Sequence, residues 1–314
     1  MYLYVVSCLL TYVCVLLAVA FFTLFERKGL SYIQIRKGPN KVSFAGLLQP
    51  ISDAVKLLSK EVVKPTVVNY GPYLAAPVFS FFLALLLWQL YPSLYSLSYF
   101  KCGALFFLCV SSLNVYGTLL AGWSSNSKYA LLGSLRAIAQ TISYEVSMAL
   151  ILLVPLFLVG TFSFIEIKEA QSLVWLSFLL IPASFLWFVT CVAETNRAPF
   201  DFAEGESELV SGFNIEYGSV GFALIFLAEY ANILIMSLLS ALLFFGGSSG
   251  VFLGDSDMLF MVKVLFFCFT FIWLRASYPR FRYDLLMSLS WKGFLPASLC
   301  FLMMISCGCY LIFY

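Results

Sequence analysis

Histidine is absent from this sequence of 314 residues, and its nine cysteines form no C-x-x-C pair. The absence of histidine excludes His-based catalysis and haem held by histidine, and zinc and iron–sulphur sites lose their usual ligands as well. The cysteines lie mostly inside apolar runs, where a thiol behaves as a small apolar side chain. We therefore expect no metal site on this chain, and we expect any redox cofactor to be bound by another chain.

Charge is also scarce. Charged residues make up 11% of the chain, whereas hydrophobic residues make up 62% and the mean hydropathy is +0.97. Soluble domains contain about a quarter charged residues. A chain of this length has no core large enough for so many apolar side chains, so lipid must surround it. The sequence predicts an all-α integral membrane protein, and its net charge of +2 gives no reason to expect a nucleic-acid partner.

Eight apolar stretches are long enough to cross a bilayer as helices, which takes about 20 residues. They fall near residues 2–25, 71–92, 103–121, 138–160, 173–193, 220–245, 259–276 and 294–314. The first has neither a basic n-region nor a small-residue cleavage site, which favours a spanning helix over a signal peptide. Because no internal repeat or low-complexity linker divides the chain, we expect residues 1–314 to form a single membrane domain. The one flexible run, Gly246 to Gly250 (GGSSG), is predicted to be a plain connector.

The connections between these spans differ strongly in charge. With eight spans, the four odd-numbered connections share one side of the membrane, and they carry 8, 2, 1 and 4 of the 18 Lys and Arg residues. The other side keeps only Lys101, Lys168 and Lys263. Since positive charge favours the cytoplasmic side of a membrane, the odd-numbered connections are predicted to lie in the cytoplasm or the mitochondrial matrix.

The first connection contains an amphipathic stretch, Gly46 to Lys60. Its apolar residues repeat at helical spacing, and its charged residues fall on another face. The apolar set is Leu47, Leu48, Ile51, Val55 and Leu58, and the charged set is Asp53, Lys56 and Lys60. One interpretation is a surface helix in the headgroup layer with its lysines toward anionic lipid. The other is the wall of a cavity, in which Asp53 and Lys56 pair at i,i+3.

Two carboxylates, Glu145 and Glu229, lie inside predicted spans. If their helices start near residues 138 and 220, they lie about 10 Å and about 14 Å along the helix, at roughly 1.5 Å per residue. A carboxylate at such a depth is costly and indicates a functional site by default. The alternative for Glu145 is a protonated side chain that forms a hydrogen bond between helices.

The third odd-numbered connection breaks the charge pattern of its neighbours. It contains six acidic residues and a single cation, Arg197. The acidic residues are Glu194, Asp201, Glu204, Glu206, Glu208 and Glu216. A solvated acidic loop is the usual interpretation of such a run, but here the acids alternate with aromatic and aliphatic residues. Burial and mutual repulsion would favour protonated carboxylates, as a proton relay requires.

The fourth odd-numbered connection supplies cations that could compensate these acids. Arg275, Arg280 and Arg282 lie around the sequence PRFRYD at 279–284. Arginine suits a fixed pairing with a carboxylate because it stays charged and presents a planar fork of donors. Simple anchoring on the positive side of the membrane is an equally good interpretation of these three residues.

Taken together, these motifs resemble the NADH–ubiquinone oxidoreductase chain 1 family, in order and across the whole chain. The motifs are Glu26-Arg27-Lys28, QIRKGPNK at 34–41, Gln49-Pro50 with Asp53 and Lys56, AETNRAPFDFAEGESELVS at 193–211, Glu216-Tyr217 and PRFRYD at 279–284. The acidic segment is the most specific of them. The even-numbered connections and the extreme ends carry nothing diagnostic.

The resemblance implies a core membrane subunit of respiratory complex I, located where the membrane arm meets the redox arm. Partly tilted helices would enclose a chamber that ubiquinone enters from the bilayer. FMN and the iron–sulphur clusters would reside on partner subunits, and the contacts of this chain would be those subunits, small membrane subunits, ubiquinone and lipid. A multi-pass protein of the mitochondrial inner membrane, encoded in the organelle, is favoured over one of a bacterial plasma membrane by the 33 phenylalanines that an AT-rich genome would give.

The resemblance also implies roles for individual residues. It places Arg27, Arg36, Asp53, Lys56, Arg275 and Arg280 along the quinone tunnel or at its mouth. It assigns Glu145, Glu194, Arg197, Asp201, Glu204, Glu206, Glu208, Glu216 and Glu229 to a proton and coupling path. Two other functions stay open: a stand-alone proton-coupled transporter, and the membrane anchor of a related energy-converting hydrogenase that uses no ubiquinone.

Overall fold

The computed structural model describes residues 2–63, 65–92, 100–172, 174–203, 205, 210–250 and 256–313. Within these ranges every regular element is helical, which confirms the predicted fold class. The long helices are α1 (Tyr2–Ile33), α3 (Tyr70–Leu87), α4 (Gly103–Ser124), α5 (Lys128–Val159), α10 (Ser219–Phe244), α11 (Asp257–Ser277) and α13 (Leu295–Phe313). Shorter helices are α2 (Gln49–Ser59), α6 (Phe164–Ala170), α7 (Leu176–Leu179), α8 (Ile181–Glu194) and α12 (Tyr283–Leu289). Single turns are η1 (Phe44–Gly46), η2 (Trp88–Leu90), η3 (Gly212–Asn214) and the π-helical η4 (Ser290–Phe294).

Seven helical segments of the described residues are long and apolar enough to cross a membrane, judged by length and composition. The stretch 173–193 was predicted to be an eighth spanning helix, but within the described residues it is not a single long helix. It breaks at Leu180, and α8 has only 14 residues, fewer than the about 20 that a perpendicular span needs. Pro182 explains the break, because proline lacks a backbone donor and is accepted in the first turn of a helix but not in its interior.

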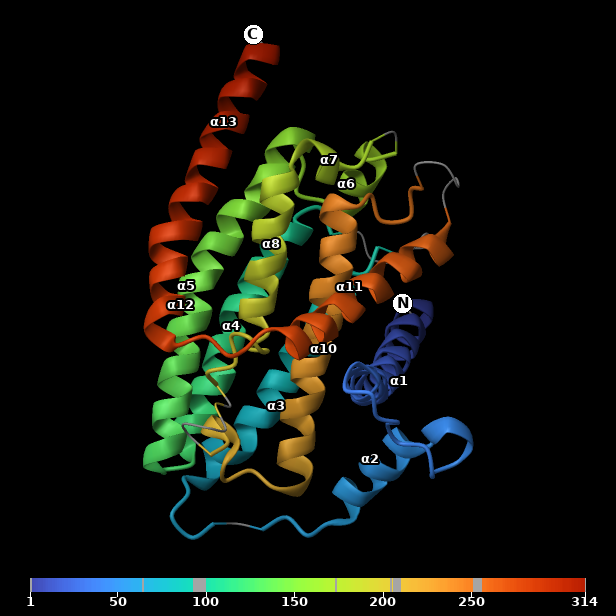
Figure 1. Cartoon of the computed structure of the whole chain (residues 1–314), viewed down its shortest axis with the longest axis vertical. Helices are drawn as coiled ribbons and strands as arrows, with labels where there is room; N and C mark the ends of the chain where they lie inside the picture. Colours follow the sequence, from blue (N-terminus) through green and yellow to red (C-terminus); the bar gives the residue numbers. More distant parts are fainter. Residues whose placement is uncertain are drawn as a thin grey trace.

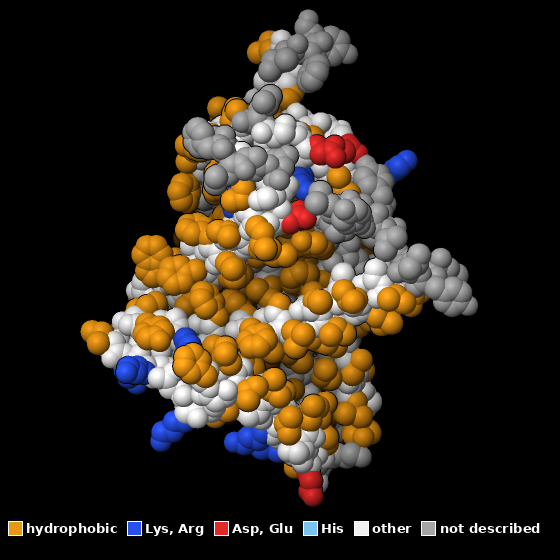
Figure 2. Space-filling model, turned by 90° about the vertical axis from the view of Figure 1, so that its right-hand side faces the viewer, with side chains coloured by type: hydrophobic (Ala, Val, Ile, Leu, Met, Phe, Trp, Pro, Cys, Tyr) orange, Lys and Arg blue, Asp and Glu red, His pale blue; other side chains and the backbone are white. Residues whose placement is uncertain are grey.

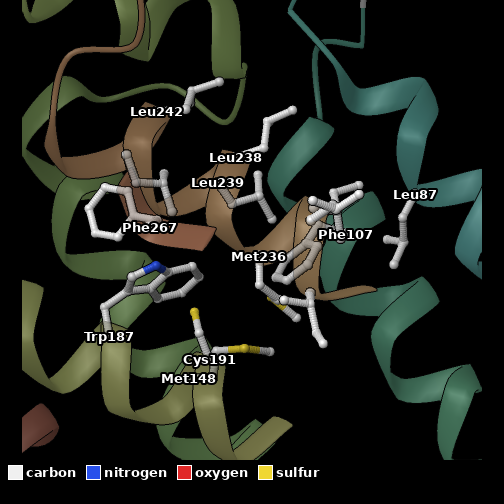
Figure 3. Packing of buried hydrophobic residues seen from close by; sticks show 14 of the residues in the cluster. Leu87, Phe107, Met148, Trp187, Cys191, Met236, Leu238, Leu239, Leu242 and Phe267 are labelled. Carbon is white, nitrogen blue, oxygen red and sulfur yellow. The ribbon is translucent and has the colours of Figure 1, made fainter. Parts of the chain in front are cut away.

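Helix α10 lies at the centre of the bundle and packs against α1, α3, α8 and α11 (Figure 1). It is buried along most of its length, whereas α1 and the segment from α12 to α13 present most of their surface outward. In the core beside α10, Trp187, Cys191 and Met148 meet side chains from several helices (Figure 3). Cys191 is fully buried among apolar groups, as expected for a thiol that acts as a small apolar residue.

The outer surface suits a lipid environment. Hydrophobic side chains cover the middle of the face in Figure 2, and several Lys and Arg side chains gather toward its lower part. In Figure 1, α2 lies at the lower end of the bundle, while α6 and α7 lie at the upper end. Helix α13 continues beyond its neighbours, with Met303 and Met304 exposed.

The predicted amphipathic helix is present as α2, which contacts α1 and α10. Its start is fixed by Pro50 in the first turn, where proline is well accommodated. Leu48, Ile51 and Val55 are all exposed in the isolated chain, so α2 presents an apolar stripe outward. Helix α2 is therefore a surface helix, and its apolar side chains are available to lipid or to a ligand.

Candidate functional site

The end of α1 and helix α2 are joined by a surface ion pair. Arg27 Nη1 lies 2.6 Å from Asp53 Oδ2, and the Gln49 amide donates a 2.9 Å hydrogen bond to the other Asp53 oxygen. The pairing of Asp53 with Lys56, one of the two interpretations of this stretch, is not observed within the described part of the chain, where Asp53 pairs with Arg27. Gln49, one turn before Asp53, helps to orient the carboxylate toward α1, and Lys56 stays exposed on α2.

Arg36 lies apart from this pair. It is exposed in the segment after α1, where its guanidinium is hydrogen-bonded to the Gln34 side chain. The structure thus brings Arg27 and Asp53 into contact, and it leaves Arg36 and Lys56 as surface cations nearby in sequence. Their shared role at a tunnel mouth remains a prediction.

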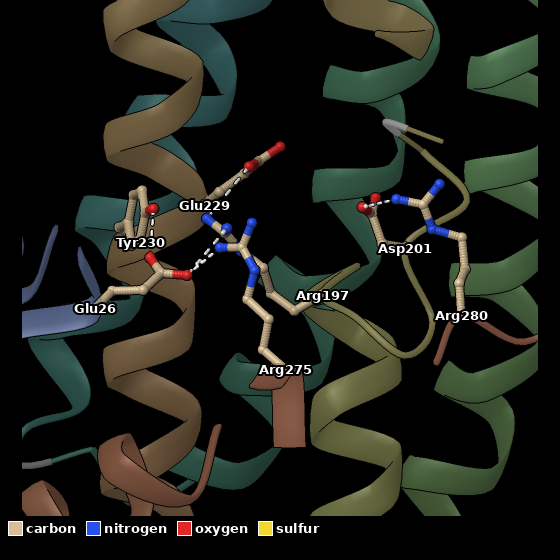
Figure 4. Close-up of polar contacts among 7 residues, drawn as sticks. All are labelled: Glu26, Arg197, Asp201, Glu229, Tyr230, Arg275 and Arg280. Atoms are coloured by element: carbon tan, nitrogen blue, oxygen red, sulfur yellow. Dashed lines mark hydrogen bonds and ion pairs between the residues drawn. The ribbon is translucent and has the colours of Figure 1, made fainter. Parts of the chain in front are cut away.

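A buried polar network begins at Glu26, the residue before Arg27. Glu26 is 6% exposed, and it receives a 2.6 Å hydrogen bond from Tyr230 of α10 and an ion pair from Arg275 of α11 (Figure 4). Glu26 belongs to the Glu26-Arg27-Lys28 motif, but neither a role for Glu26 nor its contact with Tyr230 was predicted from the sequence. The available signal was a carboxylate directly after an apolar run of 25 residues.

Arg197 links Glu26 to Glu229 of α10. Its guanidinium nitrogens lie 3.9 Å from an oxygen of each carboxylate, and its central carbon lies 4.4 Å from the centroid of the Tyr230 ring. Arg197 is almost fully buried. A buried charge is tolerated only when it is compensated, so two arginines facing two carboxylates form a balanced group. Arginine also suits this position because it packs favourably on an aromatic face.

Beyond Glu229 lies a small polar cavity between α3, α4 and α10. Its volume is about 40 Å³, and its charged lining residues are Glu194 and Glu229. Asparagines at 114, 196 and 232 add amide groups to the wall. Within the described residues, Glu194 Oε2 has no hydrogen-bond partner although it is buried. Since about 10–15 Å³ holds one water, the cavity has room for water that could bond this oxygen.

Glu145 is an electrostatic neighbour of Glu194. It lies half-buried on α5, close enough for its charge to act on Glu194. The structure thus arranges Glu26, Arg197, Glu229, Glu194 and Glu145 in one series. Asn114 and Asn232 were not predicted, because an amide inside an apolar run carries no diagnostic spacing, and Asn196 belongs to the quoted acidic segment, where no role was assigned to it.

Comparison with known proteins identifies the family of this site. The profile of the NADH dehydrogenase family matches residues 6–306. The chain is 60% identical to the NADH-ubiquinone oxidoreductase chain 1 of Heterololigo bleekeri over 308 residues, covering 98% of this chain and 96% of that relative. It is 58% identical to the protein of the same name from Anopheles gambiae over 297 residues, covering 95% and 93%. The chain belongs to the NADH-ubiquinone oxidoreductase chain 1 family. The resemblance seen in the motifs is confirmed.

In this member of the chain 1 family, the acidic segment is tied to the cations that were expected to compensate it. Asp201 accepts a 3.0 Å hydrogen bond from Arg280. The aromatic residues of the segment are buried: Phe200 packs on Phe281 and Phe202 on Tyr283, with ring centroids 5.5 and 5.9 Å apart. Glu204, Glu206 and Glu208 lie outside the described residues. Arg282 forms an exposed pair with Asp284.

Glu216 contacts the bundle through its backbone carbonyl. Its carbonyl accepts a 2.7 Å hydrogen bond from Tyr73, whose ring stacks on Tyr217 at 4.4 Å between centroids. The Tyr217 hydroxyl in turn donates to the Tyr73 carbonyl at 3.2 Å. Burial raises the pKa of Tyr217 to about 12, although the neighbouring Ser124 hydroxyl lowers it. The hydroxyl therefore stays protonated at physiological pH, and the stacked tyrosines join α3 to the end of the acidic segment.

Proposed function

We propose that this chain is a core membrane subunit of proton-pumping NADH:ubiquinone oxidoreductase in the inner mitochondrial membrane. In this complex it would form the access tunnel of ubiquinone and the start of the proton path toward the membrane arm. The relatives from Heterololigo bleekeri and Anopheles gambiae match this chain over nearly their whole length, and both are named as chain 1 of this oxidoreductase. FMN and the iron–sulphur clusters would then reside on partner subunits.

The coupling part of this proposal rests on two neighbouring residues at the end of α1. Glu26 and Arg27 are consecutive residues of α1 that point to different surroundings. Arg27 faces α2, where it and Asp53 are 54% and 34% exposed, whereas Glu26 lies in the buried network with 8% of its side chain exposed. A change of charge at the surface pair therefore acts directly on the first carboxylate of the buried series.

The surface side of α1 and α2 suits a quinone. The apolar stripe of Leu48, Ile51 and Val55 matches an isoprenoid tail in chemistry, and the cations Arg27, Arg36 and Lys56 lie along the same region of sequence. Reduction of ubiquinone takes electrons from a cluster on a partner subunit and protons from the surroundings, so that its carbonyl oxygens become hydroxyls. The uptake of protons changes the electrostatic field at Arg27 and Asp53.

The buried side can transmit that change. Arg197 lies equally far from Glu26 and Glu229, and at 3.9 Å neither contact is a close hydrogen bond. If Glu26 takes up a proton, the attraction on Arg197 shifts to Glu229 and stabilises the charged form of Glu229, so that a proton reaching Glu229 would be passed on instead of being held there. Water in the cavity would carry that proton toward Glu194, and the nearby charge of Glu145 would draw it onward.

A single substitution tests the proton path. Glu229→Gln in the assembled complex keeps the shape of the side chain but removes its charge and its exchangeable acid proton. We expect proton translocation per electron to fall, with the complex still assembled. Unchanged proton translocation would show that Glu229 is not part of the proton path.

The tunnel needs a separate test. A photoreactive ubiquinone analogue should label residues 26–60, and an excess of a tunnel inhibitor should prevent the labelling. The absence of any label in this region would refute the tunnel assignment, and it would favour a membrane anchor that uses no quinone.

A further inference from the structure

Lys263, a membrane-embedded lysine that plays no part in the site above, is held by backbone oxygens. It lies six residues into α11, about 9 Å along the helix. Its ammonium donates hydrogen bonds to the carbonyl oxygens of Phe245, Gly247 and Ser249 at 2.6, 2.9 and 2.6 Å. We call these three oxygens the carbonyl cage. The same ammonium lies 4.5 Å from the centroid of the Trp175 ring.

The segment that forms the carbonyl cage was predicted to be a plain connector; it lies between α10 and α11 as expected, and it is also packed into the structure. Residues 246–249 are buried. The Gln171 side chain donates to the last carbonyls of α10 and accepts from the Gly246 amide at 3.0 Å. Glycine is required here, because Gly246 has φ +70° and a Cβ on it would lie 2.8 Å from Trp175.

The charge and shape of lysine match this cage. A compact ammonium has three tetrahedrally arranged donors, which rotate together about one bond and can point to three acceptors, whereas a guanidinium offers a flat fork. A cation also interacts favourably with the carbonyl end of a helix, and the cage directly follows the end of α10. A lysine that served only as a membrane anchor would extend toward the headgroups instead.

The carbonyl cage lies at one end of a closed frame made by α10 and α11. These two helices pack together and α11 returns obliquely across α10 (Figure 1). From Phe245 back to Tyr230 is about 22 Å along α10, and from Lys263 to Arg275 is about 18 Å along α11. At the second end, Tyr230 and Arg275 both bond to Glu26.

We propose that Lys263 is a positioning residue that fixes the axial position of α10 against α11 and thereby sets Tyr230 and Glu229 against Glu26 and Arg197. A helix transmits an axial displacement along its whole length because its backbone hydrogen bonds run parallel to its axis. Release of the carbonyl cage would therefore let α10 slide at the network, far from Lys263. The consequence for proton transfer rests on the proposed function of that network.

The test compares Lys263→Met with Lys101→Met in the assembled complex. Lys101 is an exposed lysine on the same charge-poor side. Lys101→Met therefore removes the same single positive charge as Lys263→Met, and it serves as the control. Lys263→Met should raise amide hydrogen exchange across residues 241–250 by about tenfold or more, because bonds to a charged donor are lost. It should also lower the number of protons translocated per electron, whereas Lys101→Met should change neither quantity. Unchanged exchange would show that Lys263 does not stabilise the carbonyl cage.

Faster exchange with unchanged translocation would also overturn the positioning role, since Lys263 would then only cap α10 locally. If the methionine variant fails to assemble, Lys263→Arg decides. Arginine keeps the charge but fits the carbonyl cage poorly, so intermediate exchange and intermediate translocation are expected. Wild-type values in Lys263→Arg would show that charge alone suffices and would refute the cage.

Chemical rescue adds a readout that a merely structural loss would not give. In Lys263→Ala, n-propylammonium should restore slow exchange at 241–250 and the number of protons translocated per electron, whereas n-propanol of similar shape should not. Equal effects of the two compounds would contradict recognition of an ammonium. Failure of the network itself is distinguishable, because Glu229→Gln would then leave translocation unchanged whatever Lys263 does.

Discussion

The hydroxyl of Tyr230 on α10 donates a 2.6 Å hydrogen bond to Glu26 on α1, across 204 residues of sequence. The same ring supports Arg197 on its face, 4.4 Å from the centroid. Tyr230 therefore contacts the Glu26 carboxylate with its hydroxyl and the Arg197 guanidinium with the face of its ring. The hydroxyl and the ring can be tested separately.

Tyr230→Phe removes the hydroxyl and keeps the ring. We expect a loss of about 1.5–3 kcal/mol of stability, because the bond is made to a charged acceptor, and a lower midpoint of thermal inactivation of the complex. Tyr116→Phe is the control, since Tyr116 is 58% exposed on α4. Equal midpoints for the two variants would contradict a stabilising role of the Tyr230 hydroxyl.

Arg197→Met leaves Glu26 and Glu229 without the cation between them. The expected cost is about 3–5 kcal/mol, the usual range when one partner of a buried ion pair is removed. Arg282→Met provides the matched control, because Arg282 and Asp284 are 80% and 74% exposed and such pairs stabilise little. The yield of assembled complex and its thermal midpoint measure both. If Arg282→Met proved the more harmful variant, the buried network would not be the stabilising element.

Asp201 and Arg280 should behave as a coupled pair. Each of Asp201→Asn and Arg280→Gln should lower ubiquinone reduction, because each leaves a partly buried charge without its partner. The double variant should be no worse than the more harmful single variant, with a coupling energy of about 0.5–3 kcal/mol. Strict additivity of the two effects in a double-mutant cycle would show that the pair is not energetically linked.

Gly133→Ala should destabilise the contact between α5 and η3. A Cβ at Gly133 would lie 2.9 Å from the Cα of Gly212 and 3.0 Å from the Phe213 amide, and backbone atoms cannot easily move away. Overpacking of this kind costs about 1–3 kcal/mol. Gly308→Ala on α13 meets no atom within 4 Å and should be tolerated. Thermal midpoints of the assembled complex compare the two, and a tolerated Gly133→Ala would mean that η3 is not closely packed.

The fold class followed from the sequence because hydropathy and helical periodicity are local properties. The helix α2 was predicted for that reason, and Pro182 was available as a signal for the break before α8. Contacts across the bundle were not predictable in this way. Asp53 turns to Arg27 instead of Lys56, and Glu26 meets Arg275, 249 residues away, because the packing of α1 brings them together. Spacing along one helix contains no information about such partners.

Glu26 and Arg27 lie on adjacent faces of α1, and this placement has a consequence for the range of the proposed coupling. Mobile ions screen the exposed pair of Arg27 and Asp53, but they do not reach a side chain as buried as Glu26. The field crosses a single helix, about 10 Å in diameter, into a region of low dielectric constant where it acts strongly. If this chain has the proposed function, ionic strength should alter the binding of a quinone headgroup at this surface, while the transfer of the electrostatic signal across α1 should stay nearly constant.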